Sequence, residues 1–524
     1  MSHYQLDILH WTMQLEWWWY VLLFLGVIFV RDVFFNRKHA ITHNYPIVGH
    51  IRYMLETIGP ELRQYIVANN REELPFNRSE RSWIYSSSKE ENNYQGFGTD
   101  QDIHEPNYHF IKPSLFPYIM TDDHPNMKDR NLLPCAKVMG EFNERKRPYR
   151  PRSIINIAAM SYGSLSSKAI ESLNKGALKS GCYHNTGEGG LSPYHSNGAD
   201  VVFQFGTGYF GVRDQEGEFS MDLLEKLVEN NSFVRAIEIK LSQGAKPGKG
   251  GVLPAHKISS EIAKIRGVKK GKDVISPSFH TAFDGVDGLL DFIEQVAERT
   301  GLPVGIKSAV GRTEQWEYLA RKMKERGRGP DFITIDGGEG GTGAAPPSFA
   351  DHVSLPFFYA FSAVYNIFLN AGLTDRIVFV ASGKLGLPDQ AAKALAMGAD
   401  LINVAREAMM SIGCIQAQVC HTNRCPSGVA TQNRWLQSGI NVPLKSDRFA
   451  NYARAFRKEL LEVTMSSGYE HPCLYTMHDI EVSMGDSNYT KTLRDCFGYE
   501  KKPVHFRGMN DLINSPYLGN QDGA

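Results

Sequence analysis

The chain has 524 residues, with 57 Lys and Arg residues against 57 Asp and Glu residues, so its formal net charge is zero. A zero net charge excludes the global basic field that nucleic-acid binding needs, and a hydrophobic content of 42% excludes a largely disordered chain. Seven cysteines in so long a chain do not indicate a disulfide scaffold, and the placement of the 48 glycines decides their meaning.

The first predicted element is an apolar helix at about residues 15–35. Three tryptophans and Tyr20 open the uninterrupted apolar run at 17–30, and Arg31, Arg37 and Lys38 follow it. A spanning helix needs about 20 mostly apolar residues, and basic residues mark the cytoplasmic side. We expect residues 1–38 to anchor the protein in a membrane, with the catalytic domain in the cytoplasm. A buried or interfacial helix is the alternative; a cleaved signal peptide fits poorly because no basic segment precedes the run.

Residues 39–150 are expected to form an irregular N-terminal extension, in which spacing supports no chemistry. From Arg152 onward, short apolar, β-branched runs alternate with helical patterns such as those at 289–298 and 389–397. This alternation predicts an α/β fold with a parallel sheet, and eight units match a (β/α)8 TIM-type barrel, with a doubly wound open sheet as the alternative. The predicted strands are 153–159, 201–205, 236–241, 273–276, 303–307, 331–335, 377–381 and 400–405.

Polar residues and glycines follow these strands, and barrel enzymes build one site from such carboxyl-end loops. Residues 337–343, after the sixth strand, contain five glycines, including Gly340 and Gly341. Gly383 and Lys384 follow the seventh strand, and Arg406 follows the eighth. Because glycine lets backbone N–H groups approach a ligand, these loops predict a phosphate-bearing cofactor, although ordinary turns are the alternative. Residues 206–211 match G-x-G-x-x-G but lack the following helix of a nicotinamide site.

Three of the seven cysteines, Cys414, Cys420 and Cys425, lie within 12 residues of each other, and Pro426 follows the last. Three thiolates so close together suit a soft metal centre, and a proline after the last cysteine often accompanies iron–sulfur ligation. Zinc needs a fourth ligand, for which His421 is the only nearby candidate. We therefore expect a [3Fe–4S] cluster; three unliganded cysteines are the alternative. The other four cysteines are expected to be small hydrophobic residues.

These residues together resemble the FMN-binding domain of glutamate synthases, and in particular the stand-alone, membrane-associated members of that family. The resemblance covers residues 152–432 and rests on several motifs in a fixed order. They are AAMSYGSLS at 158–166, NTGEGG at 185–190, EIKLSQGAKPGKGGVLP at 238–254, ISP at 275–277, GGTGAAP at 340–346 and the cysteine segment at 414–432.

The resemblance implies that residues 151–440 form a barrel that holds FMN beside a [3Fe–4S] cluster, with 441–524 as a C-terminal extension packed on it. It implies reductive amination of 2-oxoglutarate to glutamate, with electrons passing from the cluster to FMN. FMN would contact Met160, Ser161, Gln204, Lys307, Gly341 and Gly383. Glu188 would be the acidic site residue, Lys240 or Lys307 would stabilise reduced flavin, and Gln243, Lys246 and Arg266 would bind the substrate carboxylates.

The sequence also departs from the family pattern. An amidotransferase domain is not expected in this chain, so ammonia or an alkylamine would come from outside it, and electrons would come from ferredoxin, another subunit or a membrane donor. Near the substrate, the family's His-Asp is Gly338-Glu339 here, and its acid in AKPGEGG is Lys249. Its Pro-Pro-His-His-Asp after Ile-Ser-Pro is Ser278-Phe279-His280-Thr281-Ala282. These departures keep two alternatives open, namely another 2-oxo or 2-hydroxy acid as substrate and a membrane-tethered flavin and iron–sulfur electron carrier.

Overall fold

The computed structural model describes residues 3–35, 40–122, 124–125, 132–485 and 489–519. The chain divides into two compact units, Met1–Ser79 and Glu80–Ala524, each described here by itself. The helical elements up to residue 89 are α1 (His3–Val30), the π-helix η1 (Arg31–Phe35), α2 (Ala40–Asn44), α3 (Val48–Leu62), the π-helix η2 (Arg63–Val67) and α4 (Arg78–Lys89).

The apolar N-terminal helix is longer than predicted, because α1 already begins at His3. Among the described residues, the stretch Trp17–Phe35 is long and apolar enough, by length and composition alone, to cross a membrane. Only 6% of this apolar stretch is buried within the structure.

The second unit contains a closed barrel of eight parallel strands in the order β10-β11-β2-β3-β4-β5-β8-β9. Closure confirms the predicted TIM-type barrel and excludes the open sheet, since β11 pairs with β2 through Ile402 and Ile155. The barrel strands are β2 (Ile155–Ile157), β3 (His184–Asn185), β4 (Val201–Phe205), β5 (Val234–Lys240), β8 (Val304–Ser308), β9 (Phe332–Asp336), β10 (Val378–Ser382) and β11 (Leu401–Val404).

One predicted barrel strand is wrong. Residues 273–276 contribute only β7 (Val274–Ile275), which pairs antiparallel with β6 (Val252–Leu253) outside the barrel. The second barrel strand is instead β3, which joins β2 and β4 through His184. A strand of two polar residues has no β-branched run or alternation, so periodicity does not detect it.

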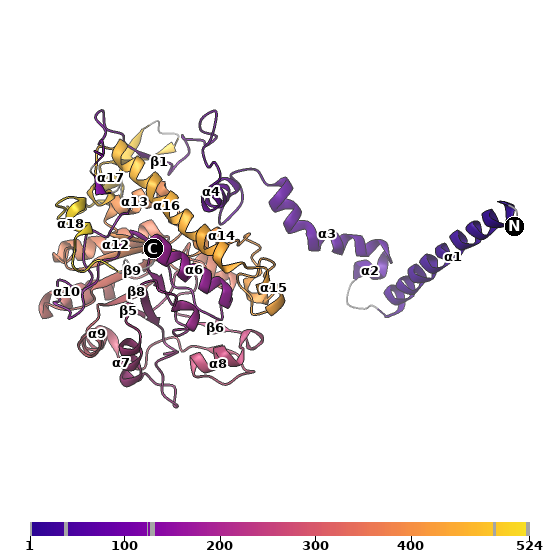
Figure 1. The fold of residues 1–524 in the computed structure, drawn as a ribbon, viewed down its shortest axis with the longest axis horizontal. Helices are drawn as coiled ribbons and strands as arrows, with labels where there is room; N and C mark the ends of the chain where they lie inside the picture. The colour runs from indigo at the N-terminus through magenta and orange to yellow at the C-terminus, as the bar shows by residue number, and fades with distance from the viewer. Residues whose placement is uncertain (1–2, 36–39, 123, 126–131, 486–488, 520–524) are drawn as a thin grey trace. The chain divides into compact units, whose positions relative to one another are not determined.

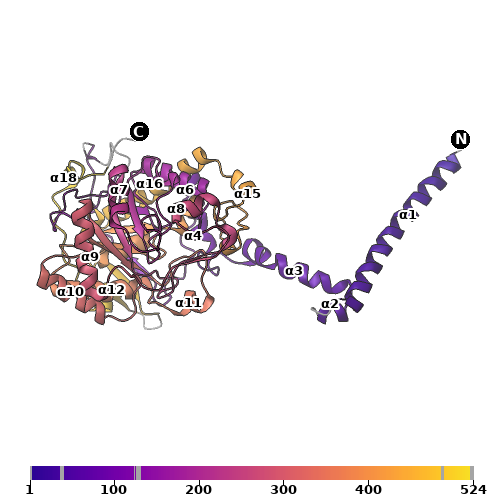
Figure 2. The same cartoon turned by 90° about the horizontal axis from the view of Figure 1, so that it is seen from below.

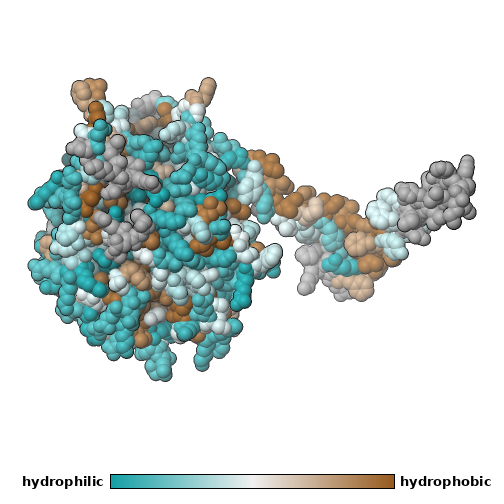
Figure 3. Space-filling model, viewed as in Figure 1, coloured by the Kyte–Doolittle hydropathy of each residue, from teal (hydrophilic) through white to brown (hydrophobic). Residues whose placement is uncertain are grey.

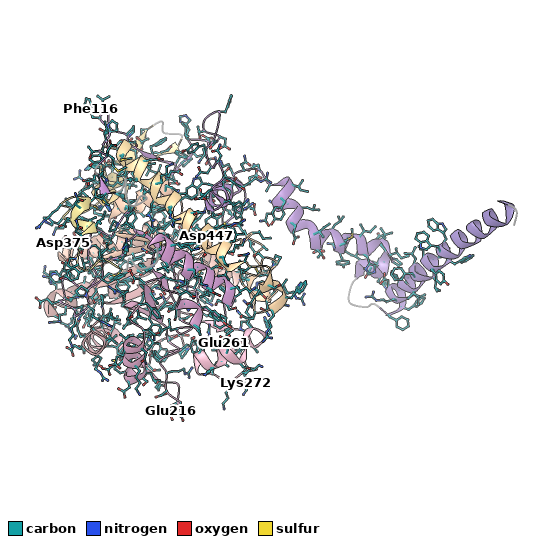
Figure 4. The ribbon with its side chains drawn as sticks, in the orientation of Figure 1. Phe116, Glu216, Glu261, Lys272, Asp375 and Asp447 are labelled. Atoms are coloured by element: carbon teal, nitrogen blue, oxygen red, sulfur yellow. The ribbon has the colours of Figure 1, made fainter. Side chains whose placement is uncertain are left out.

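Helices cover the outside of the barrel, and α9, α10 and α12 lie side by side there (Figure 1 and Figure 2). Residues at the periphery such as Glu216, Lys272 and Asp375 are exposed (Figure 4). The helices of this unit after α4 are α6 (Ser167–Ser180), α7 (Met221–Asn230), α8 (Ser260–Arg266), α9 (Gly285–Thr300), α10 (Glu314–Arg326), α11 (Pro347–His352), α12 (Phe357–Ala371), α13 (Pro388–Met397), α14 (Arg406–Ser411), α15 (Arg434–Ser438), α16 (Val442–Ser466), α17 (Leu493–Phe497) and α18 (Met509–Ile513).

The segments on either side of the barrel sequence meet each other and the barrel wall. Strand β12 (Ile480–Ser483) pairs antiparallel with β1 (His109–Ile111) and with β13 (Thr490–Thr492). Helix α16 packs on α6, where the buried Arg457 donates a hydrogen bond of 2.7 Å from Nη1 to Ser180 O. Local signals set the ends of α6: the Ser166 side chain accepts from Ala169 N, and Gly181 follows in the left-handed conformation that glycine favours.

Candidate active site

The carboxyl ends of the barrel strands bring the predicted site residues to one end of the barrel. Each of these residues lies on a barrel strand, in the loop after one, in α8 or at the start of α14. They are Met160 and Ser161 after β2, Glu188 after β3, Gln204 in β4, Lys240 at the end of β5, Gln243 and Lys246 after it, Arg266 in α8, Lys307 in β8, Gly340 and Gly341 after β9, Gly383 and Lys384 after β10, and Arg406 after β11.

Glu188 and Lys240 form the central ion pair of this end of the barrel. Lys240 Nζ lies 2.7 Å from Glu188 Oε1 and donates a second hydrogen bond of 2.7 Å to Gln243 Oε1. Burial opposes ionisation of Glu188, but the positive charge of Lys240, supported by Arg266 and Lys246, leaves the pKa of Glu188 below its ordinary value. Glu188 is therefore held as a carboxylate at the mouth of the barrel.

Two further cations lie close enough to Glu188 to interact with its charge. Lys246 Nζ donates to Ala344 O at 2.8 Å, and burial together with Lys240 lowers the pKa of Lys246. Burial lowers the pKa of Arg266 to about 10, against the opposite effect of Glu188. Arg266 Nη2 donates to Tyr162 O at 3.2 Å, whereas Arg266 Nε is buried without a hydrogen-bond partner among the described residues. An orphaned guanidinium donor beside an acid fits an absent anionic ligand.

A polar cavity with an empty volume of about 290 Å³, which includes space open to solvent, lies over the Glu188–Lys240 pair. Its lining includes Thr207, Lys249 and Ser278 besides the pair. Gly251 lies so close to Glu188 that a Cβ there would come within 2.6 Å of Glu188 Oε1. Substituting this glycine would therefore push a side chain against the central carboxylate.

The residues that depart from the family pattern are integrated into this site. His280 Nε2 lies 2.9 Å from Lys240 O and His280 Nδ1 lies 3.2 Å from Tyr209 Oη, while burial lowers the pKa of His280. Lys249 is exposed and its ammonium lies 5.7 Å from the centre of the Phe349 ring. Glu339 Oε2 accepts a hydrogen bond of 2.7 Å from Phe357 N.

A second polar network lies on the side formed by β8 to β11. Asp336 Oδ2 accepts from Gly244 N at 2.8 Å and lies 3.4 Å from Lys307 Nζ, and Asp336 Oδ1 accepts from Ser382 Oγ at 2.8 Å. Arg406 donates to Glu339 O. These contacts join the strand ends of β8, β9 and β10 to the loop residues after β5 and β9 and to Arg406 after β11.

Two glycines of this network permit close approaches. A Cβ on Gly341 would lie 2.9 Å from Arg406 Cδ, and Gly383 has a φ of +156° and would place a Cβ 2.9 Å from Phe357 Cβ. Lys384, next to Gly383, pairs with Glu80 at 2.9 Å. Lys384 follows β10 and Arg406 follows β11, the last two barrel strands in the sequence. Barrels commonly bind a phosphate at this position, and two cations beside glycines fit a phosphate group.

The barrel interior contains a carboxylate to which sequence reasoning assigned no role. Glu238 is 1% exposed and accepts hydrogen bonds from Gln204 Nε2 at 2.5 Å, Asn185 Nδ2 at 2.8 Å and Thr334 Oγ1 at 2.6 Å. The signal was present, because Glu238 opens one of the family-like motifs. Gln204, which we expect at the cofactor, donates a hydrogen bond from Nε2 to Glu238.

Cys414, Cys420 and Cys425 line one mainly apolar cavity, whose empty volume of about 290 Å³ includes open solvent. Burial, with the neighbouring thiols, raises the pKa of Cys420 and raises that of Cys414 to about 12. Among the described residues, no group of three His, Cys, Asp or Glu side chains has the arrangement of a metal-ion site. Of the other four cysteines, three are buried as predicted and Cys496 is exposed, which corrects that prediction.

Lys257 is the buried cation beside these cysteines. It is 3% exposed, and its ammonium donates to Cys420 O at 2.8 Å and Ala430 O at 3.3 Å. Burial lowers the pKa of Lys257, and the charges of Cys420 and Cys425 act in the opposite direction. Tyr85 donates a hydrogen bond of 2.9 Å to Cys414 O.

A closed (β/α)8 barrel with a carboxylate among lysine and arginine side chains at its carboxyl end defines a barrel enzyme. Residues 114–470 match the conserved region in glutamate synthase. The chain belongs to the glutamate synthase family and is an oxidoreductase of the glutamate synthase type.

Known relatives cover the chain to different extents. The glutamate synthase large subunit-like protein YerD of Bacillus subtilis is 38% identical over 88% of this chain and 94% of its own length. Archaeal-type glutamate synthase (NADPH) of Thermotoga sp. and archaeal glutamate synthase (NADPH) of Methanocaldococcus jannaschii are each 35% identical over 60% of this chain, which spans 59% of their length. A mandelate oxidase structure matches 79% of this chain at 13% identity, with a TM-score of 0.43.

Proposed function

We propose that this protein is an FMN- and iron–sulfur-dependent oxidoreductase that reductively aminates 2-oxoglutarate to glutamate. Ammonia, or an alkylamine, reaches the site from outside the chain. The observation that carries the proposal is the Glu188 carboxylate, paired with Lys240 at 2.7 Å and flanked by Lys246 and Arg266, at the mouth of a glutamate synthase-type barrel. This arrangement suits a dicarboxylate substrate whose reacting carbon becomes positively charged as an imine.

The cations bind the substrate carboxylates, and Glu188 binds the substrate nitrogen. Lys246, Arg266 with its orphaned Nε, and the amide of Gln243 bind the two carboxylates of 2-oxoglutarate. Condensation with ammonia releases water and forms 2-iminoglutarate. Glu188 Oε1 accepts a hydrogen bond from the protonated imine nitrogen, and Lys240 fixes the orientation of Glu188.

FMN fits the strand ends of the other side of the barrel. Arg406 and Lys384, which now pairs with Glu80, would hold its phosphate. Met160, Ser161, Lys307, Gly341 and Gly383 would adjoin its ring system. When bound, FMN supplies the hydride that reduces the imine carbon. Asp336 orients Lys307 and accepts a hydrogen bond from Gly244 N, and Gly244 leaves no room for a side chain against Gly337 O. Gln204 would also adjoin the cofactor, with its amide oriented by Glu238.

A [3Fe–4S] cluster fits the cysteine cavity. The three sulfur ligands line one space, and a cluster of several irons separates its thiolates further than a single ion does, so the absence of a single-ion arrangement among described residues does not oppose it. Lys257 supplies a positive charge beside two of the thiolates. The cluster would pass single electrons inward from ferredoxin, another subunit or a membrane donor.

The anchor proposal follows from the exposed helix Trp17–Phe35, which Arg31 interrupts near its end. We expect the barrel on the cytoplasmic side, because basic residues follow the apolar run. The domain limits proposed from the sequence, 1–38, 39–150, 151–440 and 441–524, describe an anchor, an extension, the cofactor barrel and a C-terminal extension.

A second candidate is a closely related reaction on another 2-oxo or 2-hydroxy acid. Lys249 stands at the cavity where the family carries an acid, and an added cation favours a substrate with more negative charge. A third candidate is a tethered electron-transfer protein without its own substrate. Electron transfer alone does not account for the Glu188 ion-pair cluster.

A steady-state assay with 2-oxoglutarate, ammonium and reduced ferredoxin tests the proposal. Glutamate formation that requires all three components is expected. Formation of a different amino acid from a panel of 2-oxo acids would favour the second candidate. No amino acid product, with both cofactors bound to the protein and reducible, would contradict the proposed function.

A further inference from the structure

Helix α3 has an apolar face that no other described element of its own unit, Met1–Ser79, covers. Val48, Ile51, Leu55, Ile58 and Leu62 recur at the three- and four-residue spacing that aligns side chains on one side of a helix. Their exposed fractions run from 40% at Leu62 to 65% at Val48, and Met54 beside them is 55% exposed. Figure 3 shows the hydrophobic colour along this part of the molecule.

The opposite face of α3 is polar. Arg52 and Glu56 pair there at 3.5 Å, and Thr57 Oγ1 donates to Tyr53 O at 2.8 Å. Arg63 begins η2 directly after the helix and is exposed. A helix with one apolar and one charged face lies at a boundary between an apolar phase and water. The apolar helix Trp17–Phe35 differs, because it is apolar all round.

A buried polar contact fixes the level at which α3 begins. His50 Nε2, in the first turn of α3, lies 2.6 Å from Asp32 Oδ2, and Ile47 N donates to the same oxygen at 3.4 Å. Asp32 is fully buried and follows Arg31 at the end of the apolar run. If the run spans a membrane, Arg31 and Asp32 lie at the headgroups, and the first turn of α3 lies at the same level.

We propose that α3 lies in the headgroup–acyl boundary of the membrane, with its apolar face in the acyl region and Arg52 and Arg63 toward anionic headgroups. The proposal rests on the membrane anchor proposed above. Lipid is the occupant that fits, because the neighbouring helix needs lipid on all sides and the Asp32–His50 contact joins α3 to its end. Long basic side chains reach headgroup phosphates from this depth.

The test uses the full chain, reconstituted in vesicles of phosphatidylcholine and phosphatidylglycerol. Trypsin cleavage after Arg52 and Arg63 is followed by mass spectrometry for the native protein and for Ile58→Glu and Thr57→Glu. These two substitutions introduce the same group at adjacent positions about 100° apart around α3, Ile58 on the apolar face and Thr57 on the polar side. Native protein and T57E are expected to be protected, whereas I58E is expected to be cleaved about tenfold faster. Leu55→Glu is a second variant of the apolar face.

An alkaline carbonate wash separates this proposal from the anchor proposal. Retention of all four proteins after the wash supports the anchor whatever happens at α3, and release of the native protein rejects the anchor. Equal cleavage of native protein, I58E and T57E in washed vesicles overturns the α3 proposal alone. Protection that disappears when the protein is diluted in excess lipid would assign the face to a second copy and also overturn it.

Discussion

Glu188 is an acid surrounded by three cations, and this has a consequence for stability. Its folded pKa lies below the ordinary value of 4.5 because Lys240 and its neighbours outweigh burial. An acid whose folded pKa is lowered contributes stability that is present above its unfolded pKa and is lost as pH falls through its folded pKa. We expect Glu188→Gln to lower the unfolding free energy by about 2 kcal/mol at pH 7, since a hydrogen bond to a charged group is worth about that much.

Thermal or urea unfolding at several pH values checks this prediction. The difference between native protein and E188Q should shrink below pH 4.5. A difference that stays constant from neutral to acidic pH would show that the carboxylate charge is not the stabilising feature.

Lys246 leads to a prediction on the alkaline side of the pH profile. Burial and Lys240 lower its pKa from 10.5, so its positive charge is lost at a lower pH than that of an ordinary lysine. The KM for 2-oxoglutarate should therefore rise on the alkaline side before pH 10.5, with kcat less affected. Lys246→Arg should move this rise to higher pH. Identical KM profiles for both proteins would exclude Lys246 from carboxylate binding.

At the scale of elements, the cysteine loop is expected to fold around its metal centre. Cys420→Ser should lose iron and the broad visible absorption of a cluster, because one of three thiolate ligands is removed. Cys496→Ser provides the control, since that exposed cysteine lies outside the cavity. Iron content and visible spectra of the purified proteins measure the effect. Full iron content in C420S would contradict the cluster assignment.

The loops after β5 and β9 are fitted to each other through glycine. A Cβ on Gly244 would lie 1.7 Å from Gly337 O, so both backbones must shift, whereas a Cβ on Gly343 meets nothing within 4 Å. Gly244→Ala should destabilise the barrel by about 1–3 kcal/mol and weaken flavin retention, and Gly343→Ala should be close to neutral. Melting curves and flavin content compare the two; equal behaviour would mean that the contact is not structurally important.

The elements that sequence predicted and missed differ in how much local signal they carry. Strands β4, β9 and β10 are apolar runs between helices, and periodicity locates them. The loop residues around them follow, because parallel strands end at one edge. Strand β3 consists of His184 and Asn185, which form a strand only because β2 and β4 flank them. Val274 and Ile275 have strand-like side chains but pair with β6, a tertiary choice that local pattern does not encode.

In the candidate site too, sequence predicted some residues but not the contacts between distant ones. Motifs identified Glu188, Lys240 and Lys246, whose proximity follows from their strand ends. The network of Glu238 with Gln204, and the Lys257 contacts with Cys420 O, join residues distant in the chain. Spacing cannot predict such contacts, because they depend on how the barrel closes.

At the scale of the whole molecule, the anchor makes a prediction about distribution. Removing residues 1–38 should move the protein from the membrane pellet to the supernatant, because the apolar stretch Trp17–Phe35 is lost. Fractionation of cells that express both forms measures this. If α3 also binds lipid, a salt-sensitive fraction of the truncated protein stays in the pellet. An unchanged pellet fraction in high salt would reject the anchor.

The central claim is that this barrel transfers a hydride to the imine of 2-oxoglutarate. A single-turnover experiment tests it without knowledge of the natural electron donor: the protein is reduced with dithionite, excess reductant is removed, and 2-oxoglutarate and ¹⁵N-ammonium are added without oxygen. We predict that flavin absorption returns only when both are present, with labelled glutamate formed in proportion. Flavin that stays reduced, or that reoxidises without forming an amino acid, would contradict the account.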